Sequence, residues 1–201
     1  GKKFIETSIK NQSVSNIVIY SRDEMKQWEM ANFFNSKKLH FILGDVRDAK
    51  SVMKAMSNCN YVVHAAATKI VSSAETNPVE CVKTNIQGAI NVINAATDLK
   101  MKKVVALSTD KASSPFNLYG ATKLVSDKLF IAADSQNSKT CFSVVRYGNV
   151  LLSRGSLIPF YLSIKNSIYP VTHKDMTRFI MTLKDGVKLV NLALDQSLGG
   201  E

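Results

Sequence analysis

The chain has 201 residues, of which 45% are hydrophobic and 21% are charged, a composition typical of a globular domain with a real core. This composition excludes extensive disorder, and no apolar run reaches the roughly 18–20 residues of a membrane span. No basic-then-apolar signal peptide opens the chain, so we expect a cytoplasmic protein that binds no membrane.

The formal net charge is +10, and the three cysteines lie far apart at positions 59, 81 and 141. Scattered cysteines in odd number are typical of reduced thiols, and without paired histidines we expect no metal site. The basic residues are spread singly or in pairs, with no arginine-rich block or interleaved aromatics. We therefore expect an anionic small-molecule ligand rather than nucleic acid.

Short apolar runs alternate with longer segments of helical period. Buried strands are predicted at residues 17–20, 39–43, 61–63, 104–107 and 142–145, and helices at 23–34, 49–56, 78–99 and 118–133. This alternation predicts a doubly wound parallel α/β sheet of Rossmann type, forming a dinucleotide-binding domain over residues 1–150. Further helices near 158–165 and 183–195 predict the start of a smaller substrate-binding lobe over residues 151–201.

The two ends of the chain are unusual for such a domain. The chain opens with a helix-like segment at Gly1 instead of the strand and glycine-rich turn that normally hold a dinucleotide pyrophosphate. It stops at Glu201 without a terminal signal. We therefore expect an internal piece of a protein that lacks the first, central strand of the sheet.

The most informative segment joins the end of the fourth predicted strand to the next helix. Its polar residues and their neighbours are Leu107, Ser108, Thr109, Asp110 and Lys111, followed by Tyr119 and Lys123. Ligands of open α/β sheets bind at such strand ends. Tyr119 and Lys123 are four residues apart and share one helix face. The lysine ammonium and a bound cationic nicotinamide both lower the pKa of Tyr119 from about 10, so the tyrosine can take a proton from a sugar hydroxyl.

The end of the first predicted strand bears on the choice of cofactor. An acid there binds the ribose 2′-hydroxyl of NAD, whereas an arginine accommodates the 2′-phosphate of NADP. Ser21 and Arg22 follow the strand and favour NADP, and Lys26 is a further candidate for the phosphate site. Asp23 and Glu24 blur this preference, and their alternative interpretation is that of ordinary acids in the first turn of a helix.

The sequence resembles the extended short-chain dehydrogenase/reductases, and within them the C5-inverting UDP-N-acetylglucosamine 4,6-dehydratases of bacterial polysaccharide and flagellar-sugar synthesis. The matching segments are YSRDE (20–24), GDVRD (44–48), HAAA (64–67), KTN (83–85) with Gly88, STDK (108–111), LYGATK (118–123), RYGNV (146–150), SRGS (153–156) and MTRF (176–179). The Asp-Lys pair after Ser-Thr is the particular mark of the dehydratase branch.

The resemblance implies an enzyme that uses bound NADP to oxidise a UDP-sugar at C4, eliminates water across C5 and C6, and returns hydride to C6. It implies that Tyr119 is the base for the oxidation, supported by Lys123. A neutral Lys111 would remove the C5 proton, and a protonated Asp110 would donate to the leaving C6 hydroxyl, since environment can push neighbouring pKa values apart. Outside this context the Asp110–Lys111 pair would be interpreted as a surface ion pair.

The resemblance also implies contacts with cofactor and substrate. The implied cofactor-binding residues, beside those at the first strand, are Asp45, Val46, Ala66, Lys69, Leu107, Ser108, Tyr119, Lys123 and Asn149. The implied substrate-binding residues are Lys69, Asn149, Val150, Ser153, Arg154 and Thr172. Lys69 has the alternative interpretation of a solvated loop lysine. The partners expected are a UDP-sugar and further copies of the chain in a homo-oligomer.

Three residues depart from the family pattern, namely Ile70, Ser72 and Leu152. Leu152 stands where a glycine is usual, so its Cβ is expected to narrow the sugar site. One alternative function is that of a nucleotide-sugar 4-epimerase or dehydratase/epimerase of the same superfamily, and the Asp110–Lys111 pair argues against a plain epimerase. Another is that of a non-catalytic NADP-binding sensor, against which Tyr119 and Lys123 argue.

Overall fold

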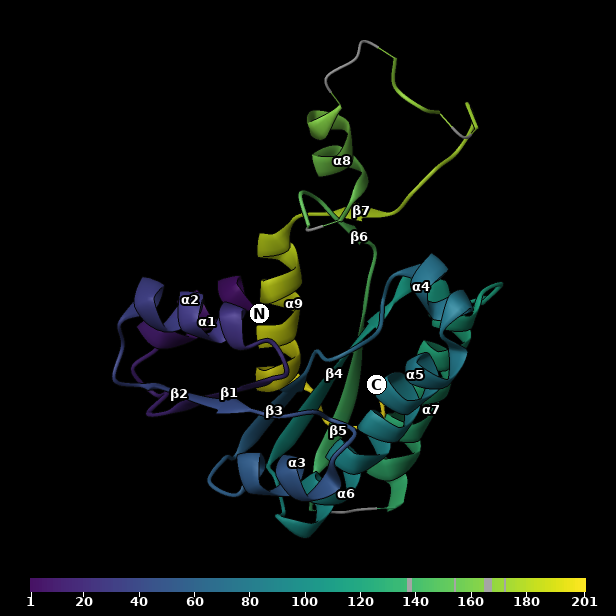
Figure 1. Cartoon of the computed structure of the whole chain (residues 1–201). Helices are drawn as coiled ribbons and strands as arrows, with labels where there is room; N and C mark the ends of the chain where they lie inside the picture. The colour runs from purple at the N-terminus through teal and green to yellow at the C-terminus, as the bar shows by residue number, and fades with distance from the viewer. Residues whose placement is uncertain (137–138, 154, 165–167, 172) are drawn as a thin grey trace.

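The computed structural model describes residues 1–136, 139–153, 155–164, 168–171 and 173–201. The longer strands are β1 (Ile17–Ser21), β2 (Leu39–Leu43), β3 (Tyr61–His64), β4 (Lys103–Thr109) and β5 (Cys141–Tyr147). All five lie at predicted positions, and they form two parallel sheets in the orders β1-β2 and β3-β4-β5 (Figure 1). A small parallel pair joins β6 (Asn149–Val150) to β7 (Ile180–Met181).

The α-helices are α1 (Lys2–Lys10), α2 (Glu24–Phe34), α3 (Ala49–Met56), α4 (Val71–Thr76), α5 (Pro78–Val82), α6 (Gly88–Asp98), α7 (Leu118–Gln136), α8 (Leu157–Ser163) and α9 (Leu183–Gln196). The helix predicted over 78–99 is helical throughout α5 and α6, and a π-helical turn, η1 (Lys83–Gln87), joins these two α-helices. The sequence analysis did not predict α4, which has six residues and no side-chain cap. The end of the helix predicted over 158–165 lies outside the described residues.

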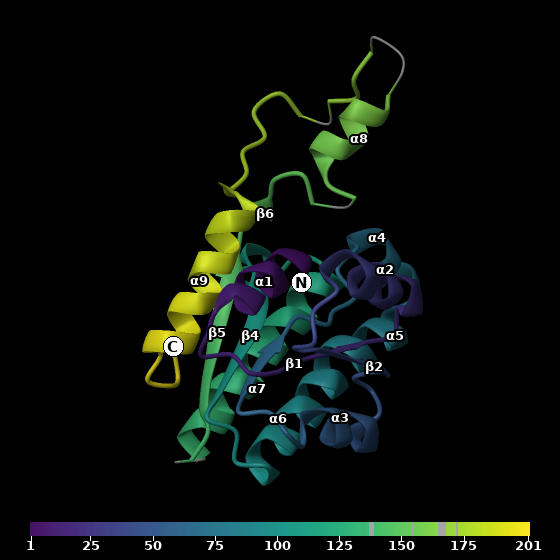
Figure 2. The same ribbon diagram turned by 90° about the vertical axis from the view of Figure 1, so that its left-hand side faces the viewer.

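Helices cover both faces of the three-stranded sheet (Figure 2). On one face α9 contacts β4 and β5, and on the other α7 contacts β4 and β5 while α6 contacts β3. Side chains alternate between these faces along β4: Val104 joins a core cluster with Phe130, and Val105 joins another with Val190. Burial on both faces explains the near-continuous apolar runs, and the doubly wound Rossmann-type fold is confirmed.

The two-stranded sheet has a smaller core of its own. Ile5 from α1, Ile19 from β1 and Leu39 from β2 are its buried residues. The helix α1 contacts both β1 and α9, so it connects this sheet to the helical layer of the larger one. Asp23 ends the turn after β1 and caps α2 by accepting a hydrogen bond from the backbone of Lys26.

The segment after β5, residues 149–182, extends away from both sheets and carries α8 (Figure 1). Large apolar side chains are exposed along it, and Leu162 and Phe179 are each 78% exposed. Its return to the core is well defined, because Thr182 and Asp185 form a capping box at the start of α9.

Candidate active site

The end of β4 brings together the polar residues that the sequence singled out. Thr109 is the last residue of the strand, and a short 3₁₀ turn, η2 (Asp110–Ala112), follows it. Lys111 Nζ lies 3.0 Å from Asp110 Oδ1 and 3.2 Å from Asn149 Oδ1. Thr109 Oγ1 donates a hydrogen bond of 3.0 Å to the same Asp110 oxygen. Four of these side chains therefore form one connected group.

Asp110 is ionised in this arrangement. Burial raises the pKa of its carboxyl group, but the hydrogen bonds from Lys111 and Thr109 outweigh burial and hold that pKa below its ordinary value. Asp110 and Lys111 thus form an ion pair here, not the neutral pair that the elimination step needs at its start.

Tyr119, at the start of α7, is joined to this group through a hydrogen bond with the Thr109 side chain. Burial raises the pKa of the Tyr119 hydroxyl, while the hydrogen bond with Thr109 lowers it and the charge of Asp110 raises it further. The balance is a raised pKa. Without a bound nicotinamide, the protein therefore does not show the predicted lowering of the Tyr119 pKa.

Lys123 lies one turn after Tyr119 and is only 2% exposed. Burial lowers the pKa of its ammonium, against the effect of the nearby Asp127 carboxylate. Asp127 is itself paired with Arg146, with 2.9 Å between Oδ2 and Nε. Within the described part of the chain, no hydrogen-bonding or ion-pair partner reaches the Lys123 ammonium, so it is available to a ligand.

The glycine after Tyr119 permits this close arrangement. A Cβ built on Gly120 would lie far inside contact distance of the Lys111 carbonyl oxygen and 3.1 Å from Pro115. Only a residue without a side chain lets the start of α7 approach η2 so closely. Gly120 therefore holds Tyr119 and the Asp110–Lys111 pair together.

The loop after β3 contains Ala66, which is partly buried, and Lys69, which is exposed. Asn85 holds this loop: it accepts a hydrogen bond of 2.8 Å from the backbone of Thr68 and donates one of 3.0 Å to the Thr68 carbonyl. It also donates to Thr122 Oγ1 on α7. Asn85 lies in the π-helical turn, a feature that is frequent at functional sites.

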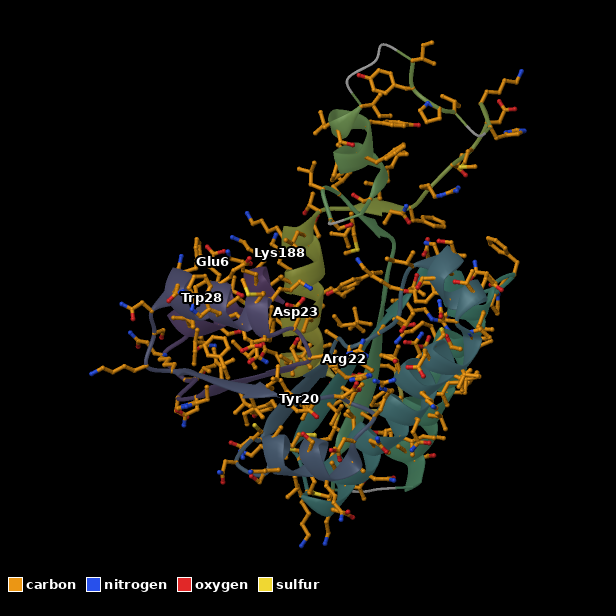
Figure 3. The ribbon with its side chains drawn as sticks, in the orientation of Figure 1. Glu6, Tyr20, Arg22, Asp23, Trp28 and Lys188 are labelled. Carbon is orange, nitrogen blue, oxygen red and sulfur yellow. The ribbon has the colours of Figure 1, made fainter. Side chains whose placement is uncertain are left out.

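Most of the predicted cofactor residues at the end of β1 have hydrogen-bonding or ion-pair partners within the chain. Arg22 is exposed just after β1 (Figure 3). Its Nη1 lies 3.4 Å from Asp45 Oδ2. Ser21 Oγ accepts a hydrogen bond from the backbone of Asp23. Lys26 pairs with the Asp23 carboxylate, and Glu24 is an exposed first-turn acid. The interpretation of Asp23 and Glu24 as ordinary helix-start acids therefore fits the structure.

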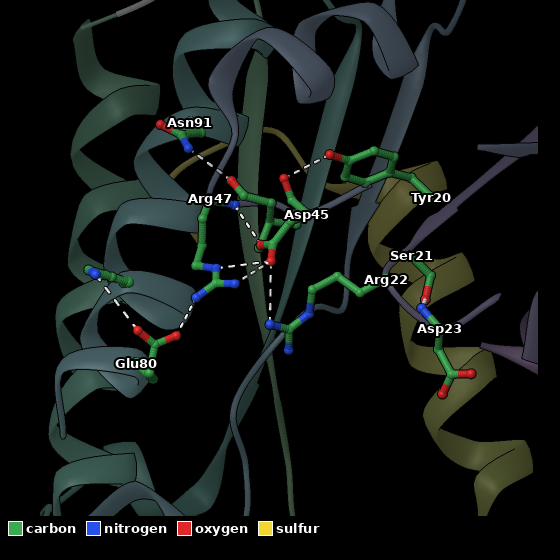
Figure 4. A network of polar contacts seen from close by, with 10 residues as sticks. Tyr20, Ser21, Arg22, Asp23, Asp45, Arg47, Glu80 and Asn91 are labelled. Atoms are coloured by element: carbon green, nitrogen blue, oxygen red, sulfur yellow. Dashed lines mark hydrogen bonds and ion pairs between the residues drawn. The ribbon is translucent and has the colours of Figure 1, made fainter. Parts of the chain in front are cut away.

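Asp45 and Val46 follow β2, and Figure 4 shows the polar network around them. Asp45 Oδ1 accepts a hydrogen bond from the backbone of Arg47, and Oδ2 accepts from its Nε at 2.9 Å and its Nη2 at 2.7 Å. Burial raises the pKa of Asp45, but the hydrogen bonds with Arg47 and the charge of Arg22 hold it below its ordinary value. Asn91 donates to the Val46 carbonyl and fixes the loop from α6.

The predicted substrate residues lie on β6 and just after it. Asn149 and Val150 pair with β7, and Ser153 closes a turn back to the Val150 carbonyl. Arg154 and Thr172 lie outside the described residues. Leu152 has a φ of 56°, in the left-handed region that favours glycine, which explains the glycine usual at this position.

Two buried side-chain atoms near these strand ends have no hydrogen-bond partner within the described residues, His64 Nε2 and Ser108 Oγ. An unsatisfied buried hydroxyl at the end of β4 fits a bound polar group. Elsewhere in the described ranges, no group of three or more His, Cys, Asp and Glu side chains could hold a metal ion. No described helix has the length and hydropathy to cross a membrane.

Sequence reasoning missed the side chains that hold the predicted site residues in place. Arg47 and Asn85 belong to segments that match the family but have no assigned partner in the sequence, and Glu80 lies outside those segments. Glu80 and Asn85 lie on the helical segment from α5 to η1, far along the chain from the residues that they hold. Asn85 carries only the signal of a polar residue on a buried helix face, and Glu80 is an exposed helix residue like many others. Neither signal identifies its partner.

The whole chain, residues 1–201, matches the family described as Polysaccharide biosynthesis protein. It is 50% identical over 206 residues to a UDP-N-acetylglucosamine 4,6-dehydratase (inverting) of Campylobacter jejuni, covering 100% of this chain and 62% of that relative. It is 44% identical over 208 residues to a UDP-glucose 4-epimerase of Rickettsia bellii, covering 100% of this chain and 61% of the other. The chain thus spans about three fifths of the length of these relatives.

A solved structure, that of Pen from Bacillus thuringiensis, superposes with a TM-score of 0.95 at 39% identity, covering 100% of this chain and 64% of that one. The arrangement of the whole chain therefore agrees with a known fold. The family match covers every residue, and on this ground the chain belongs to the polysaccharide biosynthesis protein family.

Proposed function

We propose that this chain is part of an NADP-dependent, C5-inverting UDP-N-acetylglucosamine 4,6-dehydratase. The observation that carries the proposal is the Asp110–Lys111 pair, 3.0 Å apart, which Thr109 connects to Tyr119. A group suited to oxidation at C4 thus adjoins a pair suited to elimination across C5 and C6. The 50% identity to a protein named for this reaction supports the proposal.

A nicotinamide dinucleotide fits the residues at the carboxyl ends of β1 to β4. The buried Lys123 ammonium and Ser108 hydroxyl are available there, and the exposed Arg22 suits a 2′-phosphate. Asp45 and Val46 would face the adenine, with Ala66 and Lys69 along the middle of the cofactor. A nicotinamide bound there would supply an acceptor for the C4 hydride and a donor for its return to C6.

Tyr119 would take the proton of the C4 hydroxyl as hydride leaves the same carbon. Because burial raises its pKa, the phenolate needs positive charge nearby, and the Lys123 ammonium one turn away supplies part of it. Thr109 beside the hydroxyl lowers the pKa of Tyr119 and partly offsets burial. The buried position of Lys123 strengthens its effect, since charges interact more strongly at low dielectric.

Asp110 and Lys111 carry the right number of protons for elimination. The ion pair that we observe differs from a neutral pair by the position of one proton across a 3.0 Å hydrogen bond. A substrate that covers the pair removes water and disfavours the charged form. Neutral Lys111 then takes the C5 proton, protonated Asp110 gives its proton to the leaving C6 hydroxyl to form water, and the ion pair is restored. When hydride adds at C6, a proton from solvent adds at C5 on the opposite face, and Tyr119 releases the C4 proton to solvent.

The substrate would lie between this group and β6. The contact of Asn149 with Lys111 supports a role for Asn149 at both sugar and nicotinamide, with Val150 and Ser153 further along the segment. Arg154, Thr172 and Lys69 complete the proposed substrate contacts by resemblance. The basic charge balance suits the two phosphates of a UDP-sugar.

A second candidate function is 4-epimerisation of a UDP-sugar. The observation in its favour is the 44% identity to proteins named UDP-glucose 4-epimerase over the whole chain. Epimerisation needs oxidation and reduction at C4 but no proton removal from C5, so it assigns no role to Lys111. The product formed separates the two candidates.

The test incubates the intact protein with UDP-N-acetylglucosamine and follows the sugar by NMR. We expect a 4-keto-6-deoxy product with inverted C5, and formation of the C4 epimer alone would favour the second candidate. In Lys111→Ala, oxidation proceeds while elimination stalls, so reduced-nicotinamide absorbance accumulates in the presence of substrate. Lys54→Ala, an exposed lysine on α3, is the matched control. Absence of reduced cofactor in Lys111→Ala would contradict the role of Lys111 after oxidation.

A further inference from the structure

The carboxylate of Asp45 lies between two arginines that hold it very unequally (Figure 4). Arg47 donates to it from its backbone N–H, its Nε and its Nη2, all at 2.7–2.9 Å. Arg22 approaches it with one nitrogen, at 3.4 Å. Two short charge-assisted hydrogen bonds from one guanidinium to Oδ2, with a third from the backbone to Oδ1, hold a carboxylate more strongly than a single long contact. Arg47 therefore satisfies Asp45, and Arg22 is only loosely attached.

Arg47 is itself held from the opposite side. Its Nη1 pairs with Glu80 on α5, and Glu80 also lies 3.7 Å from Lys83 Nζ. The Arg47 side chain is 32% exposed, against 55% for Arg22. A guanidinium fixed between two carboxylates cannot leave Asp45 without leaving Glu80 as well. The chain thus provides one firmly held arginine and one loosely held arginine at the same carboxylate.

The unequal contacts of the two arginines with Asp45 affect how easily an anion binds at Arg22. An unpaired carboxylate at position 45 would take Arg22 as its counterion and would repel a phosphate from the same place. With Arg47 in position, the charge of Asp45 is already balanced, and moving Arg22 away breaks only one long contact. Arg22 can then turn to the phosphate at little cost.

We propose that Arg47, held by Glu80, is a positioning residue that keeps Asp45 paired and so frees Arg22 to bind a 2′-phosphorylated nucleotide. Arg47 sets the preference for the 2′-phosphate without touching it. This inference rests on the cofactor site of the proposed function and adds a residue that determines its specificity.

The test measures binding of two probes, 2′,5′-ADP and 5′-AMP, to the intact protein freed of bound nucleotide, by calorimetry. The wild-type protein should prefer 2′,5′-ADP. In Arg47→Gln that preference should fall about tenfold, the size expected when one charge-assisted contact is lost. Glu80→Gln should lower it less, because Arg47 keeps its hydrogen bonds to Asp45. Lys3→Gln, which removes an exposed ion pair with Glu6 on α1, is the matched control.

Variants made in Asp45→Asn distinguish a positioning role of Arg47 from direct contact between Arg47 and the phosphate. In Asp45→Asn the carboxylate that competes for Arg22 is gone, so adding Arg47→Gln should leave the preference for 2′,5′-ADP unchanged. A further tenfold loss in that background would mean that Arg47 binds the phosphate itself and would overturn the proposal. Circular dichroism of each variant checks that the fold is retained.

The remaining outcomes distinguish this inference from the function on which it rests. If Arg47→Gln keeps the wild-type preference, the inference is wrong and the proposed cofactor site stands. If the wild-type protein binds both probes equally, Arg22 does not recognise the 2′-phosphate, and the inference fails with it. If it binds neither probe, the cofactor site of the proposed function fails.

Discussion

Two regions contribute residues to the same candidate site but are held in different ways. In residues 108–123 the proposed catalytic side chains are buried or half-buried, with Thr109 6% exposed and Lys123 2% exposed, and hydrogen bonds link Thr109, Asp110 and Lys111. In the segment of residues 149–182 the pairing of β6 with β7 and the helix α8 hold the backbone, while side chains such as Leu162 and Phe179 face solvent.

This difference suits the first region to proton transfer and the second region to recognition of the substrate. Buried polar groups with satisfied hydrogen bonds are positioned by the whole core, which is what a proton-transfer group needs. A segment with few buried side chains has low local stability and adapts more easily to what it binds. We expect changes at residues 108–123 to abolish the reaction, and changes in the segment to alter stability or fit by smaller amounts.

Tyr119→Phe should have the largest effect. It removes only the hydroxyl that accepts the C4 proton, so turnover should fall about 10²–10⁴-fold while nucleotide-sugar binding stays nearly unchanged. Steady-state turnover of UDP-N-acetylglucosamine measures the loss of activity, and calorimetry with the same sugar nucleotide measures binding. Leu157→Ala, an exposed apolar residue of the segment, is the comparison variant and should keep most activity. Wild-type turnover in Tyr119→Phe would remove Tyr119 from the mechanism.

Two glycines, one in each region, sharpen the comparison. The Cβ in Gly120→Ala meets the Lys111 backbone, which cannot move aside like a side chain, so we expect a loss of about 1–3 kcal/mol in unfolding free energy together with reduced turnover. At Gly155 nothing lies within 4 Å, and only its φ of +75° opposes a side chain. Gly155→Ala should therefore lose about 1 kcal/mol with little change in turnover. Equal turnover in the two variants would contradict the close packing of α7 on η2.

His64 is buried at the end of β3, beside β4 of the first region, and should make stability depend on pH. Burial and the nearby charge of Lys123 lower the pKa of His64 to about 3. Between that value and about 6.5 the unfolded chain binds a proton at this position that the folded chain does not. Stability should therefore fall as the pH drops from 7 to 5, by up to about 1.4 kcal/mol per pH unit.

His64→Phe should flatten this slope when denaturant unfolding is measured at several values between pH 7 and pH 5. That range lies above the titration of ordinary carboxylates, so Asp45 and Asp110 contribute little to it. His173→Gln, at an exposed position of the segment, is the control and should leave the slope unchanged. A slope that survives in His64→Phe would show that His64 is not its source.

The strands and most helices could be predicted because their signal is local. Buried parallel strands such as β4 must be apolar on both faces, and Thr182 with Asp185 marks the start of α9 by a capping box. The helix α4 was missed because six residues without a cap carry almost no such signal. The grouping of Asp110, Lys111 and Tyr119 was also predictable, since all three lie within one strand-to-helix connection.

The supporting side chains and protonation states could not be read from the sequence. Glu80 reaches Arg47 across 33 positions, and Asn85 reaches Thr122 across 37, so neither contact has a local pattern. Burial raises the pKa of Tyr119 against the expected lowering by Lys123, because desolvation depends on everything packed around the hydroxyl. A spacing of four residues shows that two groups share a helix face, but not the environment of that face.

Leu152 gives the smallest expected effect and tests whether the segment stores backbone strain. Its φ of 56° is unfavourable for a residue with a Cβ, and its side chain is 66% exposed, so little buried area is lost on truncation. Leu152→Gly should therefore be more stable than Leu152→Ala by about 1 kcal/mol, because both lose the side chain but only glycine accepts this conformation freely. Denaturant unfolding of the two variants measures the difference directly. If alanine is as stable as glycine there, the left-handed conformation carries no strain, and the glycine usual at this position serves contact with the substrate instead.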